Sequence, residues 1–383
     1  MKTLSLLCAA TSTLHAADFE LDLNSHLNLA AGAASTHEAD LATHGHDPND
    51  EFTLQGFELN ASARYGDYLS GFVAYNTFLD EDDKIDGELE EAFLKLSDLP
   101  HGFELRAGRF LNRVGTQNSQ HLHAWHFADA NLTTARFLGE EGLLTNSVEL
   151  SYKLPFEHDA LLSVGFGDAI AHDHHEDEHG HDHEHLEGEE ALLADDIITA
   201  RLKGIYKRND FNSITYGLSG AWGDNGFGES TSLYGGDLTY QWRENGIEPG
   251  GRSFRATVET IYREFDYAGE IEEEVMGMHE DVQVSGSSSE WGVHTHLGYG
   301  FNENWSADFR YDYLEGVGEP IGEAPERHRT SLAVTRNFSY NDYLAGHVRL
   351  QYNHDEIDGE ESLNEDAIWL QFQLDLGKGG EVR

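Results

Sequence analysis

Apolar and polar side chains alternate along most of the chain, and turn-forming residues separate the alternating segments. In Ile368–Leu376 the apolar residues stand at nearly every second position, and in Ile198–Lys207 the charged residues share one face. A period of two residues is that of a β-strand with one apolar and one polar face. About sixteen such segments lie between Asp18 and Leu376, within the range of bacterial membrane barrels. A soluble β-sandwich would show the same alternation.

The lengths of the connections separate these two folds. Every second connection is short, and the intervening ones are long, acidic and often histidine-bearing. The short connections are Tyr65–Tyr68, Pro155–His158, Lys207–Asp210, Phe301–Asn304 and Phe338–Asn341, and the long ones include Ser35–Asp50, 170–194, Gly269–Asp281 and Asp355–Glu365. Outer-membrane barrels pair short periplasmic turns with longer extracellular loops. We therefore predict an all-β fold, a transmembrane antiparallel β-barrel of about sixteen strands formed by residues 18–383.

The first residues have the pattern of an export signal. Lys2 precedes the apolar run Leu4–Ala10, and small residues at Ala16 and Ala17 offer a cleavage zone, so we predict a signal peptide over 1–17. A buried first strand is the alternative. Cys8 is the sole cysteine, so the mature chain would offer no thiolate to a metal. With no run of roughly twenty apolar residues, the predicted location is the Gram-negative outer membrane, among its lipid and lipopolysaccharide.

Composition narrows the range of partners. The chain has 383 residues, with 71 acidic and 24 basic side chains and a formal net charge of −47. Such a chain repels nucleic acid and attracts cations, divalent metal ions included. We therefore expect no nucleic-acid partner.

A histidine-rich tract lies within the long connection 170–194. Its histidines alternate with Asp and Glu: His172, His174, His175, His179, His181, His183 and His185. Such a polar segment buries too little surface to offset its ordering entropy, so we predict a solvated extracellular loop. Imidazole suits Zn²⁺, and we expect weak, multi-site binding of zinc or another divalent cation. The alternative is a pH-sensitive loop without a metal role.

The connection at 111–141, after the fifth predicted strand, differs from the outer loops. It is less acidic and contains Leu122, Trp125 and Phe127, and the spacing over His121–Ala130 predicts a short amphipathic helix. Because it is unfavourable to expose those apolar side chains to water, we predict that this inner loop folds into the lumen.

Two sets of lumen residues are candidates for function. Imidazoles and a carboxylate of the inner loop could bind a divalent cation, with anchoring of the loop to the wall as the alternative: His121, His123, His126 and Asp129. Inward basic residues could set up a transverse field against Glu140, Glu141 and Asp129: Arg106, Arg201, Lys203, Arg255, Arg263, Arg310 and Arg349. The alternative is the compensated charge that any polar lumen needs.

In strand order, loop phase and this one long loop, the chain resembles the general bacterial porins. The resemblance covers nearly the whole mature chain, rests on no specific motif, and implies that the inner loop forms a constriction and that the protein is a homotrimer. The stretches Leu105–Phe110, His121–His123 and Ala135–Gly142 also resemble barrel proteins described as zinc-regulated outer-membrane receptors. Energy-coupled receptors have about 22 strands and a plug, for which the chain before its first strand leaves no room.

These features predict a channel for passive uptake of small hydrophilic solutes, biased to divalent metal cations, with zinc as the expected ion. The alternatives are an anion- or phosphate-selective porin and a surface metal-binding barrel without transport. We expect no enzyme activity and no required cofactor beyond weakly bound divalent cation. A recording of conductance across a planar bilayer separates the three functions.

Overall fold

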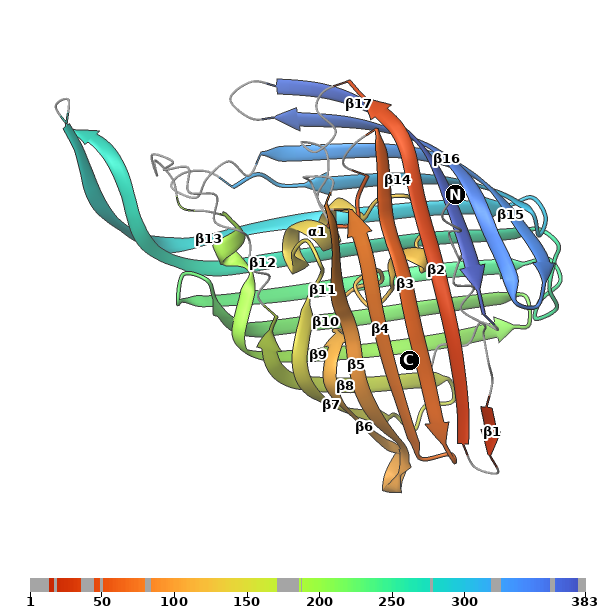
Figure 1. The fold of residues 1–383 in the computed structure, drawn as a ribbon. Coiled ribbons are helices and arrows are strands. Elements are labelled where there is room, and N and C mark those ends of the chain that lie inside the picture. Colours follow the sequence, from red (N-terminus) through yellow and green to blue (C-terminus); the bar gives the residue numbers. More distant parts are fainter. Residues whose placement is uncertain are drawn as a thin grey trace, which may run out of the picture.

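Sixteen antiparallel strands form a closed barrel, as the alternation predicts (Figure 1). The computed structural model describes residues 14–16, 19–35, 45–48, 51–79, 84–170, 186, 188–275, 278–317, 325–358 and 362–377. Strands β2 to β17 pair in chain order, and β17 pairs with β2 to close the ring. The strands are β2 (Phe19–Ala34), β3 (Phe52–Tyr65), β4 (Leu69–Leu79), β5 (Ile85–Leu99), β6 (Phe103–Leu111), β7 (Leu144–Lys153), β8 (Asp159–Ala169), β9 (Leu193–Asn209), β10 (Asn212–Asn225), β11 (Ser230–Arg243), β12 (Ser253–Val275), β13 (Met278–Gly300), β14 (Trp305–Leu314), β15 (Glu326–Asn341), β16 (Leu344–Asp358) and β17 (Ser362–Leu376).

A short strand, β1 (Leu14–Ala16), lies outside this ring. It pairs with β2, with Leu14 opposite Leu21. Residues 14–16 belong to the predicted signal peptide, and the ring closes through β17 and β2 without them. The signal peptide over 1–17 therefore stays a prediction.

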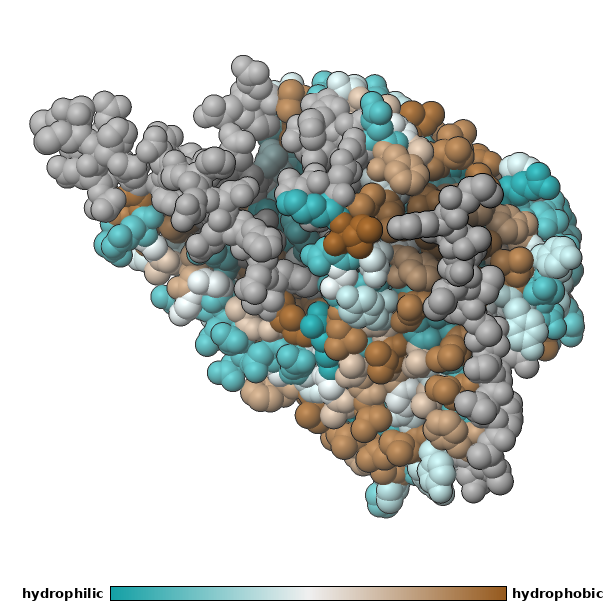
Figure 2. All heavy atoms as spheres, in the orientation of Figure 1, coloured by the Kyte–Doolittle hydropathy of each residue, from teal (hydrophilic) through white to brown (hydrophobic). Residues whose placement is uncertain are grey.

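The two faces of the wall differ as the period of two requires. On β12, Glu259 and Arg263 are buried toward the lumen, whereas Val258 and Tyr262 on the other face are exposed. Apolar side chains gather over the strands of the visible wall (Figure 2). Exposed aromatic rings lie beside the short turns, as in Tyr65, Tyr68, Tyr206, Trp305, Tyr340 and Tyr343. This is the outward surface that a hydrocarbon layer requires.

The connections keep the predicted phase, with four departures. The predicted loop Asp355–Glu365 is mostly strand, because β16 continues to Asp358, opposite Ser362 of β17. The segment Gly269–Asp281, predicted as a loop, instead continues β12 and β13 as a paired hairpin up to Val275 opposite Met278, which projects beyond the rim (Figure 1). The acidic composition suggested a loop, but backbone pairing continues beyond the barrel wall. The β10–β11 turn is short although it lies at the long-loop end, and residues 244–252 make a longer connection at the other end.

The connection between β6 and β7 folds into the lumen, which confirms the prediction for 111–141. It contains the 3-10 helix η3 (Leu122–Ala124) and the helix α1 (Leu132–Leu138), and α1 packs against β12, β13 and β14. The helix predicted over His121–Ala130 is wrong in extent and place. Two further 3-10 helices are η2 (Pro100–Gly102) and η4 (Gly188–Ala191). Among the described residues, none of the helices is long and apolar enough to span a bilayer.

Candidate functional site

The inner loop is held in place by its own apolar residues and by one helix cap. Leu122, Trp125, Phe127 and Phe137 are buried in the lumen. Asn131 begins α1, and its side chain accepts a hydrogen bond from the Thr134 amide at 2.7 Å. Asn is a preferred N-cap because it satisfies one of the free amides of the first turn. The loop is thus a packed element with a defined surface toward each wall.

Asp129 anchors the loop to the arginine-rich wall. Its carboxylate accepts hydrogen bonds from Arg310 at 2.7 Å and Arg329 at 2.9 Å, and from Gln351 at 2.6 Å and Asn353 at 2.9 Å. Burial would raise the pKa of Asp129, but the two guanidinium groups lower it to about 2. The predicted metal-ligand role of Asp129 does not fit this position, because four donors already occupy its two oxygens.

The three inner-loop histidines do not come together, although the sequence analysis grouped them in one candidate site for a cation. They do not lie on a common helix, because η3 ends at Ala124. His121 and His123 contact carboxylates of β3 and β5, whereas His126 lies against His296 of β13 with ring centroids 4.7 Å apart. The histidines therefore belong to two separate clusters.

The first cluster begins at the long-loop end, where His46 meets three glutamates. The His46 Nε2 atom lies 3.6 Å from Glu88 Oε1, 3.3 Å from Glu90 Oε1 and 3.5 Å from Glu141 Oε2. Burial lowers the pKa of His46, but the three carboxylates outweigh it and raise the pKa to about 10. Glu90 then continues the cluster, because its other oxygen lies 2.7 Å from Nδ1 of His121.

The cluster runs on past His121 toward the short-turn end. The His121 Nε2 atom lies 2.9 Å from Glu91, and its Nδ1 atom lies 3.4 Å from Glu58. Burial opposes protonation of His121, yet Glu58 and Glu90 raise its pKa well above the usual value. The other oxygen of Glu58 contacts His123 at 2.9 Å.

The last members of the cluster are a histidine of β2 and an aspartate of β17. The ring of His123 stacks on His26 at 3.7 Å between centroids, and His26 lies 2.8 Å from Asp375. We call this whole series the imidazole–carboxylate row, made of His46, Glu88, Glu90, Glu141, His121, Glu91, Glu58, His123, His26 and Asp375. Of these residues, the sequence analysis placed only His121, His123 and Glu141 among the site residues.

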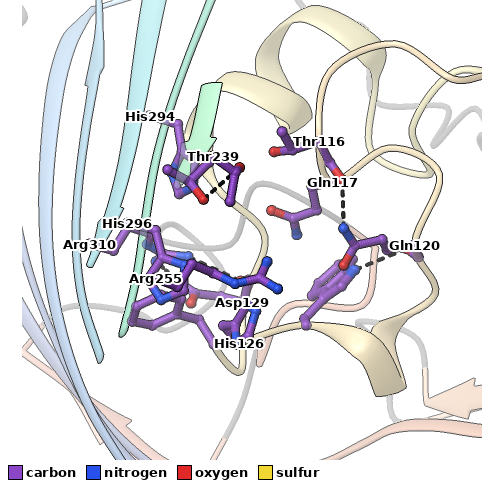
Figure 3. Close-up of a pocket in the computed structure, with 13 residues that line it drawn as sticks. Thr116, Gln117, Gln120, His126, Asp129, Thr239, Arg255, His294, His296 and Arg310 are labelled. Carbon is purple, nitrogen blue, oxygen red and sulfur yellow. Dashed lines mark hydrogen bonds and ion pairs between the residues drawn. The ribbon is translucent and has the colours of Figure 1, made fainter. Parts of the chain in front are cut away.

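The second cluster lies across the inner loop, around a cavity of about 60 Å³ (Figure 3). His296 Nε2 lies 2.8 Å from Asp308, and His126, His296 and Asp308 present ligand atoms to one another. Arg255 and Arg310 line the same cavity. Burial, His296 and Arg255 lower the pKa of His126 to about 3. This cationic surrounding disfavours a metal cation here.

Most of the predicted pore-lining arginines are paired within the wall or bound to the inner loop. Arg106 pairs with Glu149 at 3.1 Å and Arg201 with Asp237 at 2.8 Å. Three others are held as follows: Arg263 pairs with Glu290, Arg310 with Asp129, and Arg349 donates to the Trp125 carbonyl at 2.8 Å. These contacts fit the alternative of compensated charge.

Lys203 and Arg255 line a cavity of about 740 Å³, together with the paired residues Arg106 and Arg201. The inner loop roofs this cavity through Arg113, Thr116 and Gln120, and its lower wall reaches Lys153 and Asp159 at the short-turn end. The cavity therefore gives the lumen a polar vestibule with basic side chains.

The expected transverse field takes a different form from the one predicted. Asp129 does face Arg310, as expected. Glu141, however, faces His46, and the backbone carbonyl of Glu140 accepts a hydrogen bond from the Gly45 amide at 3.1 Å. The end of the inner loop is therefore joined to the β2–β3 loop.

The seven histidines of the tract, His172 to His185, lie outside the described residues. His175–His179 also spells H-E-x-x-H, which can bind zinc when it lies on a helix. In a tract of alternating histidine and acidic residues, composition alone produces such patterns. Weak metal binding by the tract stays a prediction.

Comparison with known proteins supports the fold. No family model matches the sequence. An uncharacterized protein of Aquifex aeolicus (strain VF5) is 33% identical over 126 residues, and that match spans 32% of this chain but only 26% of the relative. No activity can be carried over from so short a match.

Solved structures resemble the chain over almost its full length. The outer membrane channel DcaP of Acinetobacter baumannii superposes with a TM-score of 0.55 at 11% identity, covering 94% of this chain and 99% of that one. OmpT of Vibrio cholerae gives 0.54 at 9% identity, covering 96% and 100%. The anion-selective porin of Comamonas acidovorans gives 0.52 at 12% identity, covering 94% and 100%. These comparisons give no support to the resemblance to zinc-regulated receptors. They establish that this chain has the sixteen-stranded β-barrel fold of outer-membrane porins and channels.

Proposed function

We propose that the chain is an outer-membrane channel for passive passage of small hydrophilic solutes, with a bias to divalent cations and zinc as the expected ion. The closed barrel with an apolar exterior, the inward-folded loop and the polar vestibule of about 740 Å³ support a channel. Passage by diffusion needs no covalent step, and the proposal assigns no catalytic residue.

The imidazole–carboxylate row carries the cation bias. It holds four imidazoles and six carboxylates, so it stays net negative even when every imidazole is protonated. Glu58 and Glu90 each offer one oxygen to one histidine and the second oxygen to the next. Neighbouring sites that share ligands suit conduction, because an ion must bind well enough to enter and weakly enough to leave.

The outer loops add to this bias. The net charge of −47 and the acidic, histidine-bearing extracellular segments raise the concentration of cations at the mouth of the barrel. Capture by the histidine tract and passage along the row are therefore two steps of the same proposal.

Planar-bilayer recording with the refolded full chain tests the proposal. In a ZnCl₂ gradient, we expect a reversal potential on the cation side. Glu58→Gln should shift that potential toward zero, whereas Glu303→Gln, a change in the exposed β13–β14 turn, should leave it in place. A reversal potential on the anion side, or one insensitive to Glu58, contradicts the cation bias.

An anion-selective channel is the second candidate. It is favoured by Lys203 and Arg255, which line the large cavity, and by the likeness to the anion-selective porin of Comamonas acidovorans. In that case the reversal potential would lie on the anion side and depend on Arg255. A chain that never conducts would instead be a metal-binding barrel without transport.

A homotrimer is the assembly that we propose. Vibrio cholerae OmpT, whose fold this chain shares, has a trimer form. Chemical cross-linking of the chain in outer-membrane lipid with lipopolysaccharide should yield a threefold species, and a product limited to monomers contradicts the trimer.

A further inference from the structure

Three nitrogen–oxygen distances at the outer end of the row match those between neighbouring ligands of a metal site. Nε2 of His46 stands 3.3 to 3.6 Å from one oxygen each of Glu88, Glu90 and Glu141. Direct N–H···O hydrogen bonds usually span about 2.9 Å. Around a tetrahedral ion with bonds of about 2.0–2.1 Å, neighbouring ligand atoms are roughly 3.3–3.4 Å apart. The observed distances therefore fit ligands around an ion better than a set of direct hydrogen bonds.

The surroundings provide the space that an ion needs and a carboxylate oxygen that lacks a hydrogen bond within the described part of the chain. A cavity of about 30 Å³ lies beside these four side chains, and about 10–15 Å³ is enough space for one water molecule. The Glu88 Oε1 atom is buried and has no hydrogen-bond partner among the described residues. A buried carboxylate oxygen without a partner is costly unless a cation or donor reaches it.

We infer that His46, Glu88, Glu90 and Glu141 form a defined binding site for one divalent cation of the zinc class. One imidazole nitrogen and three carboxylate oxygens are donors that Zn²⁺ accepts in four-coordinate sites. Contacts around the ligands hold them in place. Phe78 packs edge-on against the His46 ring at 5.6 Å, and His121 fixes the second oxygen of Glu90 at 2.7 Å.

The four ligands come from three separate parts of the chain. His46 lies in the β2–β3 loop, Glu88 and Glu90 on β5, and Glu141 at the end of the inner loop. A bound ion would tie the outer loop to the inner loop, where Gly45 and Glu140 already share a backbone hydrogen bond. A role of this site in ion transport rests on the proposed function. Binding of the ion at the site does not depend on that function.

Equilibrium dialysis with Zn²⁺ and visible absorption of bound Co²⁺ test the site on the refolded full chain. Because the histidine tract would add a background, its seven histidines are first replaced by asparagine. We expect about one tightly bound ion per chain and the intense Co²⁺ spectrum of four-coordination. His46→Gln and Glu141→Gln should each weaken binding by at least roughly tenfold.

Control substitutions outside the site distinguish loss of a metal ligand from a general effect of removing charge. Glu140→Gln removes a neighbouring carboxylate and His158→Gln a histidine at the short-turn end, and both should keep the bound ion. Heat-modifiable migration on gels reports whether each variant forms a folded barrel. The inference is overturned if the folded starting protein binds no such ion, or if folded His46→Gln and Glu141→Gln bind it unchanged.

Conductance measured in KCl without divalent ions tests the proposed channel separately from the metal site. A chain that conducts but binds no ion refutes the site and leaves the channel intact. A chain that binds the ion but never conducts refutes the channel and leaves the site intact.

Discussion

Replacing Asp129 by asparagine should release the inner loop from the barrel wall. The change keeps the shape of the side chain but removes the negative charge that faces Arg310 and Arg329. Removing one partner of a buried ion pair costs about 3–5 kcal/mol. Arg329 keeps Asp355 at 3.0 Å and Arg310 keeps Asp312 at 3.1 Å, so we expect the lower end of that range.

A loss of about 3 kcal/mol changes the docking equilibrium of the loop by roughly a hundredfold. In the folded barrel, limited proteolysis should then cut the inner loop of Asp129→Asn faster than that of the unaltered chain. Single-channel recordings should show added current noise, because the loop that roofs the vestibule spends more time away from the wall.

Asp159→Asn serves as the matched control. Asp159 also pairs with a cation, Lys153 at 3.5 Å, but both side chains are about two-thirds exposed. Such a surface pair contributes about 0–1 kcal/mol, so proteolysis of the inner loop should not change. If Asp129→Asn protects the loop as well as Asp159→Asn does, the anchoring role of Asp129 is refuted.

Three further outcomes follow from the same structure. Because the pKa of Asp129 is lowered, its contribution to stability is present above the ordinary value of 3.8 and is lost as the pH falls toward about 2; proteolytic protection of the loop should fall in that window, and Asp129→Asn should show no such step. Arg255→Gln should lower the permeability to chloride relative to potassium in a bilayer, and an unchanged ratio would mean that Arg255 does not face the conducting path. Replacing the seven histidines within 171–190 by asparagine should lower growth in zinc-poor medium, and equal growth would remove the capture role.

The barrel could be predicted from the sequence because its rule is local. Alternation places one face toward lipid, and the lengths of the connections give the direction of each strand. The apolar residues Leu122, Trp125 and Phe127 likewise marked the inner loop as a segment that must be buried. The helix was misplaced because apolar spacing was given more weight than capping. Asn131, which begins α1, was the signal that could have located it.

Most members of the row could not be predicted, because its contacts join residues that are distant in the sequence. Glu58 and Glu90 read as ordinary inward carboxylates of a polar lumen, and only barrel closure and the folded loop bring them to His121. His46 lies in a loop whose path no periodicity reveals. The histidine tract drew attention by its composition, whereas a buried histidine beside three glutamates has no compositional signal.

The inner loop lies between two parts of the barrel wall that carry opposite charge. Toward each part it turns groups of the complementary charge. Toward β3 and β5 it presents imidazoles, His121 and His123, to carboxylates. Toward β14 and β16 it presents the Asp129 carboxylate and backbone carbonyls to Arg310 and Arg349. A loop that exchanged these groups would meet like charge on both sides, so the two walls fix its orientation. Under the proposed function, cations and anions would therefore meet different sides of the inner loop, and the side that stays open to ions would decide the selectivity.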